Sequence, residues 1–164
     1  MDADTITQFI VDTFSGVDVV IGDEGIGAGD RFFFYDPDRS LDPKNRFPFA
    51  TIVTKDYGDF DCASNLGRPG VFRLNIGVSS DTYRSHFGPQ PRPAAGGSPV
   101  DTGHDFSALD QLIPHPVYAA QSWIAVLNPS EETFQAIKPL LDEAHQRAVR
   151  RHPESRATGD SGGE

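Results

Sequence analysis

A histidine held between two prolines is the first candidate for chemistry in this sequence. His115 lies between Pro114 and Pro116, and Tyr118 and Trp123 follow within eight positions. Because proline fixes its own φ angle and restricts the residue before it, this segment should present the imidazole from a rigid loop. Histidine titrates near neutral pH, so His115 is suited either to proton transfer or to hydrogen bonding with a ligand.

Two polar residues of one strand are the second candidate. Residues 71–78 alternate in a way that predicts a strand with one core face and one mostly polar face. Arg73 and Asn75 share the polar face, where together they could hold a carboxylate, a phosphate or a backbone amide. The interpretation we favour is structural: Arg73 pairs with an acidic loop residue, and Asn75 caps a turn.

Five residues therefore form the predicted ligand-binding set: Arg73, Asn75, His115, Tyr118 and Trp123. Clustered aromatic groups beside a few polar ones suit recognition of a small molecule or a protein segment. For Trp123, at the start of a strand, a core position is the favoured alternative. For His115 and Tyr118, structural and ligand-contacting roles both stay open.

Catalysis by His115 is the second function class. Asp110 or a loop aspartate would have to orient the imidazole, and Ser107 could be added to make a triad. Such a triad can be assembled in almost any sequence of this length, and no Gly-x-Ser-x-Gly or His-Glu-x-x-His motif supports it. We therefore favour a non-catalytic binding module over an enzyme that uses His115 as general acid or base.

Two loops resemble ligand sites without meeting their requirements. The carboxylates of Asp56, Asp59 and Asp61 suit a divalent ion, but their spacing does not match an EF-hand loop. A solvated acidic turn is the favoured interpretation, and ion binding stays open. The glycine-rich residues 22–30 lack the third glycine of a dinucleotide fingerprint and lead into a strand, which favours a hairpin loop. No metal site and no cofactor are predicted.

Composition limits the class of protein. The chain has 164 residues and a net charge of −10, and residues 1–62 hold thirteen acidic and five basic side chains. Nucleic acid is an unlikely partner, because non-specific binding to it depends on Lys and Arg. A mean hydropathy of −0.40 predicts no membrane span. The lone Cys62 and the acidic start predict a cytoplasmic protein. We expect a monomer or a homodimer.

Hydrophobic periodicity predicts one α+β domain over residues 1–151. Strands are expected at 17–21, 31–35, 49–54, 71–78 and 123–127, and helices at 4–15, 80–87, 105–113 and 130–149. Thr5 and Gln8 are read as a capping box, and Pro139 should kink or break the last helix. Short connections favour a two-layer fold, with an antiparallel sheet of about five strands and helices on one face. Residues 88–104 are expected to form a mobile loop, and 152–164 a disordered tail.

Several segments resemble a family of uncharacterised bacterial proteins that is defined only as a domain of unknown function. They are FATIVT at 49–54, RPGVFRLNIG at 68–77, PHPVY at 114–118 and WIAVLNP at 123–129, and the resemblance spans residues 5–150. More distantly, the end of the chain is similar to the MmcQ/YjbR-like family: Pro and His precede a Trp that opens a strand, and a terminal helix follows. That similarity implies a two-layer α+β fold like that of secretion chaperones, for which DNA binding has been suggested. It implies no catalytic residue.

Overall fold

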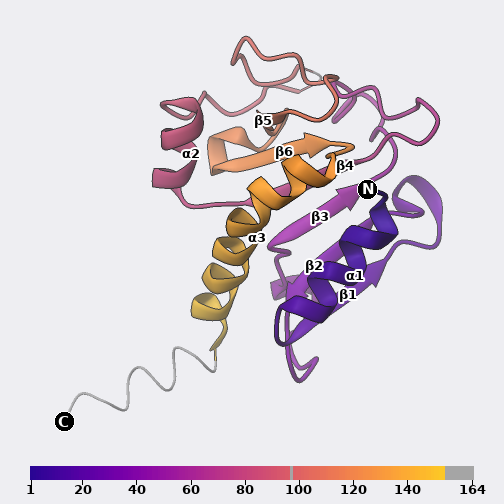
Figure 1. Ribbon diagram of the computed structural model, residues 1–164, viewed down its shortest axis with the longest axis vertical. Helices are drawn as coiled ribbons and strands as arrows, with labels where there is room; N and C mark the ends of the chain where they lie inside the picture. The colour runs from indigo at the N-terminus through magenta and orange to yellow at the C-terminus, as the bar shows by residue number, and fades with distance from the viewer. Residues whose placement is uncertain (97, 154–164) are drawn as a thin grey trace.

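The computed structural model describes residues 1–96 and 98–153, and its central element is a single antiparallel sheet (Figure 1). The strand order is β1-β2-β3-β4-β6-β5. The strands are β1 Val17–Ile21, β2 Arg31–Tyr35, β3 Ala50–Val53, β4 Arg73–Gly77, β5 Leu112–Pro114 and β6 Trp123–Leu127. The α+β class and the antiparallel sheet are confirmed, and the sheet has one strand more than expected.

The additional strand is β5, which the sequence pattern placed at the end of a short helix. Leu109, Leu112 and Ile113 have helical spacing, but Ile113 pairs with Ala125 of β6 instead. The ladder continues past Pro114, where the His115 N–H donates to the Trp123 carbonyl at 3.0 Å. Tertiary pairing overrides local periodicity here, and it fixes His115 against the first residue of β6.

Helices α1 (Ala3–Thr13) and α3 (Glu131–Arg151) cover one face of the sheet (Figure 1). Asp2 caps the N-terminus of α1, since its carboxylate accepts the Thr5 N–H at 2.8 Å, so the predicted capping box of Thr5 and Gln8 is wrong. Pro139 lies inside α3, and the predicted break into two helices is also wrong. Packing of the apolar stripe against the sheet outweighs the hydrogen bond that proline cannot donate. None of the described helices is long and apolar enough to cross a membrane.

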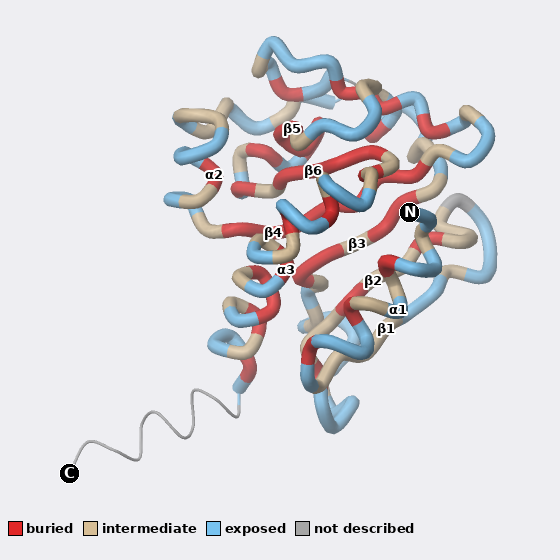
Figure 2. The backbone as a smooth tube through the Cα atoms, in the orientation of Figure 1, coloured by how far each residue is buried: buried red, intermediate tan, exposed pale blue. Residues whose placement is uncertain are grey.

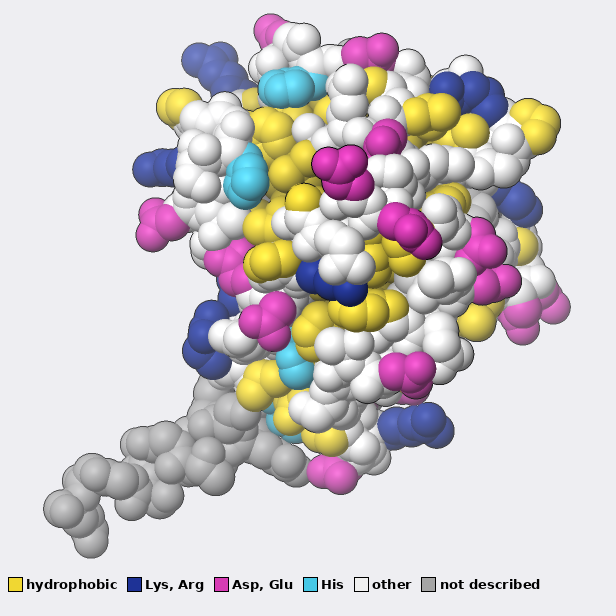
Figure 3. Space-filling model, in the orientation of Figure 1, with side chains coloured by type: hydrophobic (Ala, Val, Ile, Leu, Met, Phe, Trp, Pro, Cys, Tyr) yellow, Lys and Arg dark blue, Asp and Glu magenta, His cyan; other side chains and the backbone are white. Residues whose placement is uncertain are grey.

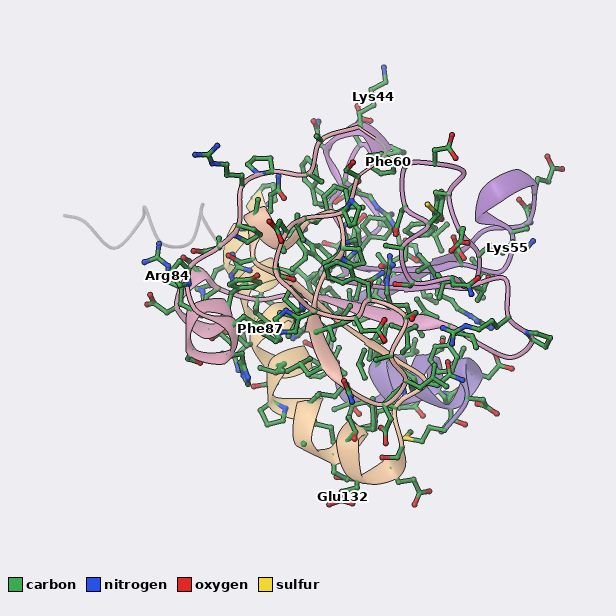
Figure 4. All side chains as sticks on the ribbon, turned by 90° about the horizontal axis from the view of Figure 1, so that it is seen from above. Lys44, Lys55, Phe60, Arg84, Phe87 and Glu132 are labelled. Atoms are coloured by element: carbon green, nitrogen blue, oxygen red, sulfur yellow. The ribbon has the colours of Figure 1, made fainter. Side chains whose placement is uncertain are left out.

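The opposite face of the sheet is covered by loops. Phe60 lies on that side of the sheet, and Glu132 of α3 lies on the other (Figure 4). Every residue of β4 is buried as a result, and Arg73 has no exposed surface (Figure 2). The face of β4 that was expected to be mostly polar is therefore a second interior, and burial in it constrains every polar group that it holds.

The segment after α2 (Ser80–Phe87) has no helix or strand among the described residues of 88–104. The Val100 N–H donates to the Pro116 carbonyl at 2.8 Å, which ties this segment to the residues beside His115. The mobility of this loop stays a prediction. The disordered tail was expected at residues 152–164, and residues 154–164 lie outside the described part of the chain. His152 is buried and is the C-cap residue of α3.

Candidate functional site

A pocket of about 300 Å³ opens on the loop-covered face of the sheet. It brings together all five residues of the predicted set: Arg73, Asn75, His115, Tyr118 and Trp123. Its other lining residues are Phe32, Pro48, Thr51, Val53, Tyr57, Phe60 and Asp61. Alternation along β3, β4 and β6 points the sheet residues of this list toward the same side. The loop that follows β5, in which Pro114 and Pro116 flank His115, contributes His115 and Tyr118 to the lining of the pocket.

Arg73 forms the floor of the pocket and is held on three sides. Its Nη1 and Nη2 donate to the two carboxylate oxygens of Asp61 at 3.0 and 2.5 Å. Nε donates to Asn75 Oδ1 at 2.7 Å, and Nη1 also donates to Ser64 Oγ at 2.9 Å. Arg73 thus pairs with an acidic loop residue, as the favoured interpretation held, but it does so inside the protein.

Asn75 connects this ion pair to the neighbouring strand. Its side chain does not cap a turn, as we had favoured; Nδ2 donates to Thr51 Oγ1 at 2.9 Å while Oδ1 accepts from Arg73. Because Thr51 and Asn75 are directly paired across β3 and β4, this contact is set by the strand register. Sequence reasoning named Asp61 only as a candidate ion ligand in an acidic turn, and it did not single out Thr51.

His115 is only 3% exposed and is oriented by backbone groups. Its Nδ1 accepts the N–H groups of Val117 and Tyr118, both at 3.0 Å. A nitrogen that accepts two hydrogen bonds carries no proton, so these contacts assign the neutral ring with its hydrogen on Nε2. Burial, with the nearby positive charge of Arg73, sets the pKa of His115 well below its usual value.

The protonated nitrogen of His115 points toward another donor. Nε2 lies 3.3 Å from Arg73 Nη2, and in the tautomer that the Nδ1 contacts assign both atoms carry hydrogen. In the part of the chain that the structure describes, Nε2 has no hydrogen-bond acceptor. Two N–H groups therefore converge at the floor of the pocket without a protein oxygen to receive them.

A second buried carboxylate supports the wall of the pocket. Tyr57 donates its phenol hydrogen to Asp30, which also accepts from the Thr54 N–H at 2.8 Å. Burial and the hydrogen bond to Asp30 raise the pKa of Tyr57 far above its ordinary range, so its proton stays on the oxygen. Neither residue was predicted as part of the site, because 27 positions separate them along the chain.

The mouth and side walls of the pocket are aromatic. Phe60 and Tyr118 are 57% and 42% exposed, and their ring centroids lie 6.2 Å apart. Trp123 lines the pocket and is only partly buried, which differs from the core position that we had favoured. Its indole packs on Gly77, the residue directly opposite it in β4. The pocket thus combines an apolar body with a polar floor.

Comparison with known proteins identifies the family of this chain but no activity. The model of a family of unknown function, DUF6194, matches residues 1–157. The chain belongs to DUF6194. No curated protein and no solved structure matches it. The expected relation to an uncharacterised family is confirmed in this form, and none of the comparisons supports a link to the MmcQ/YjbR-like family.

The alternative sites are not assembled in the DUF6194 chain. Ser107 Oγ donates to Asp105, and Asp110 accepts the Ser130 N–H at 2.7 Å, so neither contacts His115. Asp110 therefore accepts a hydrogen bond from the residue that caps the N-terminus of α3, and it does not orient the imidazole of His115. The loop aspartate Asp61 is engaged by Arg73 instead.

The carboxylates of the acidic loop, residues 56–61, point to separate partners and do not converge on one point. Asp56 accepts the Leu66 N–H at 2.9 Å, while Asp61 pairs with Arg73. Within residues 1–96 and 98–153, no three His, Cys, Asp or Glu side chains are placed to hold a metal ion. Two of the three carboxylates of the acidic loop are thus engaged within the protein, that of Asp61 by the arginine at the floor of the DUF6194 pocket.

Replacing Gly77 by alanine should distort this pocket. A Cβ at position 77 would lie 3.1 Å from both Cε2 and Cζ2 of Trp123, which is closer than ordinary packing. We expect the indole to move toward the pocket, at a cost of about 1–3 kcal/mol in the free energy of unfolding. Because Trp123 is the single tryptophan, its emission spectrum reports the movement directly, and urea titration gives the stability.

Gly67→Ala is the matched control, because a Cβ there meets no atom within 4 Å. It should leave both the emission maximum and the unfolding midpoint near the wild-type values. Equal behaviour of the two variants would show that Gly77 is not needed to seat the indole.

Proposed function

We propose that this chain is a non-catalytic module that binds a small organic molecule in the pocket beneath Phe60 and Tyr118. The observation that carries the proposal is the pair of convergent N–H groups, from Arg73 and His115, at the base of an otherwise aromatic cavity. Small-molecule sites have this composition: mostly apolar walls with a few fixed polar groups that set orientation. A volume near 300 Å³ suits a ligand of one or two rings.

The preorganised floor favours binding. Arg73 and Asn75 are held by the hydrogen bonds of their neighbours, so little side-chain entropy is lost when a ligand arrives. The exposed rings at the mouth contribute apolar area that a ligand would remove from water. Rigid polar groups below and apolar rings above are the two features that specific binding requires.

The same hydrogen bonds argue against the enzymatic alternative. A general base needs an unprotonated nitrogen that faces the substrate, but the unprotonated atom of His115 is Nδ1, which two backbone N–H groups occupy. The pocket-facing Nε2 already holds its proton. Loss of that proton would leave an imidazolate, which is far outside the range of histidine chemistry near neutral pH. His115 is therefore better suited to hold a ligand than to transfer a proton.

DNA binding, which the MmcQ/YjbR-like similarity implies, is the less favoured candidate. The chain has a net charge of −10, and Asp and Glu side chains lie among the basic ones on the helix-covered face (Figure 3). Such a surface lacks the clustered Lys and Arg that neutralise phosphates. We propose a bacterial, cytoplasmic protein, monomeric or homodimeric, whose partner is a small molecule.

A thermal-shift screen of metabolites and divalent ions tests the proposal. A ligand at one hundred times its Kd should stabilise the folded state by about 2.7 kcal/mol and raise Tm accordingly. Phe60→Ala should reduce the shift of any hit, because the ring forms the mouth of the pocket. Phe47→Ala is the matched control, since Phe47 is 75% exposed and does not line the pocket. Hits that respond equally to both variants would contradict the proposed site.

A further inference from the structure

We infer that the ligand is an uncharged molecule that presents a carbonyl oxygen to the hydrogens of Arg73 Nη2 and His115 Nε2. This inference rests on the proposed function, because it names the chemical class of the molecule that the pocket binds. It follows from a full count of the hydrogens on the two side chains, together with the charges around them.

Four of the five guanidinium hydrogens of Arg73 have protein acceptors. Nε donates to Asn75, the two hydrogens of Nη1 go to Asp61 and Ser64, and one hydrogen of Nη2 goes to Asp61. The fifth faces His115 Nε2 at 3.3 Å between the nitrogens. That nitrogen is itself protonated, because Nδ1 accepts two backbone hydrogen bonds. The fifth hydrogen of Arg73 and the Nε2 hydrogen of His115 therefore require an acceptor from outside the protein.

One oxygen can satisfy both groups. Two donor nitrogens 3.3 Å apart can each reach a single oxygen at about 2.9 Å, which is the normal N–H···O distance. Because Arg73 has no exposed surface, the ligand reaches this position only after the side chains over the guanidinium move aside. Thr51 adds a third donor nearby: its hydroxyl accepts from Asn75 Nδ2, so its own hydrogen is available to the pocket that it lines. The floor thus selects an acceptor and offers little to a ligand that only donates.

Asp61 decides the charge of that acceptor. Its carboxylate lies 2.5 Å from Arg73 Nη2, so an oxygen bound to the same nitrogen would lie within about 5.5 Å of it. A carboxylate or phosphate at this distance meets a like charge in a partly desolvated site. Arg73 cannot offset both anions, since Asp61 already compensates its charge, and Asp30 adds a further carboxylate behind Tyr57. A neutral carbonyl keeps the hydrogen bonds and avoids the repulsion.

Three ring compounds that differ in one group test the inference: benzamide, benzoate and benzylamine. We expect benzamide to bind the wild-type protein at least tenfold more tightly than either charged compound, as measured by NMR titration. Its binding should shift the side-chain resonances of His115 Nε2–H and Arg73. Without any ligand, the ¹⁵N resonances of His115 should show an unprotonated Nδ1 and a protonated Nε2.

Asp61→Asn should reverse the selectivity, because it removes the opposing charge and leaves that of Arg73. Benzoate should then gain at least tenfold in affinity relative to benzamide. If the wild type prefers benzoate, or if His115 carries its proton on Nδ1, the inference is overturned. Binding of benzoate that is lost in Phe60→Ala would still uphold the proposed function. If none of the three compounds binds, the inference fails. The proposed function is then still tested by the thermal-shift screen.

Discussion

Replacing Arg73 by methionine should lower the free energy of unfolding by about 3–5 kcal/mol, the usual cost of removing one partner of a buried ion pair. Arg73 has no exposed surface, and the side chain of Asp61 is only 8% exposed. Without the guanidinium, the carboxylate stays buried with no counter-charge, and Asn75 and Ser64 each lose a donor. Urea unfolding followed by circular dichroism measures the loss.

Two further variants separate the ion pair from general effects of losing an arginine. Arg39→Met removes a cation that is 78% exposed and pairs with Asp18 at 3.4 Å, so its cost should stay below about 1 kcal/mol. Combining Arg73→Met with Asp61→Leu should recover part of the lost stability, since no unpaired charge remains. A loss below about 1 kcal/mol in Arg73→Met alone would contradict the buried network described above.

Acidification below pH 6.5 should destabilise the protein through His115. Burial and the charge of Arg73 keep the folded-state pKa of this residue well below its ordinary value of 6.5, so the unfolded chain binds the proton first. Stability contributed by the neutral ring is fully present above pH 6.5. It is lost as the pH falls toward the folded-state pKa, at about 1.4 kcal/mol per pH unit for one proton.

His115→Asn should remove this part of the pH dependence. The asparagine oxygen can replace Nδ1 as the acceptor for the Val117 and Tyr118 N–H groups, while nothing titrates. The measurement is the free energy of unfolding from pH 7.5 to 5, compared as slopes between the wild type and the variant. His86→Asn, at an exposed histidine, should keep the wild-type slope. Parallel curves for all three proteins would mean that His115 titrates normally in the folded state.

Most secondary structure was predictable, because it depends on local patterns. Strands β1, β2 and β6 have the bounds that hydrophobic periodicity gave, and α2 ends before Gly88 as expected. The misses are places where a distant partner prevails over a local preference. The segment that ends in Pro114 becomes a strand because it pairs with β6. Helix α3 continues past Pro139 because its apolar stripe packs on the sheet.

Residue types and spacing alone also selected Arg73, Asn75, His115, Tyr118 and Trp123, and all five line one pocket. Only the tertiary structure decided what these groups are able to do. The partners that set their chemistry, Asp61 for Arg73 and Arg73 for His115, are 12 and 42 positions away in the chain. The burial of Arg73 and its charge beside His115 follow from those long-range contacts, whereas the proton placement on His115 follows from the N–H groups of Val117 and Tyr118 within its own loop. A side chain's charge state depends on what surrounds it in space, and the sequence specifies those surroundings only through the fold.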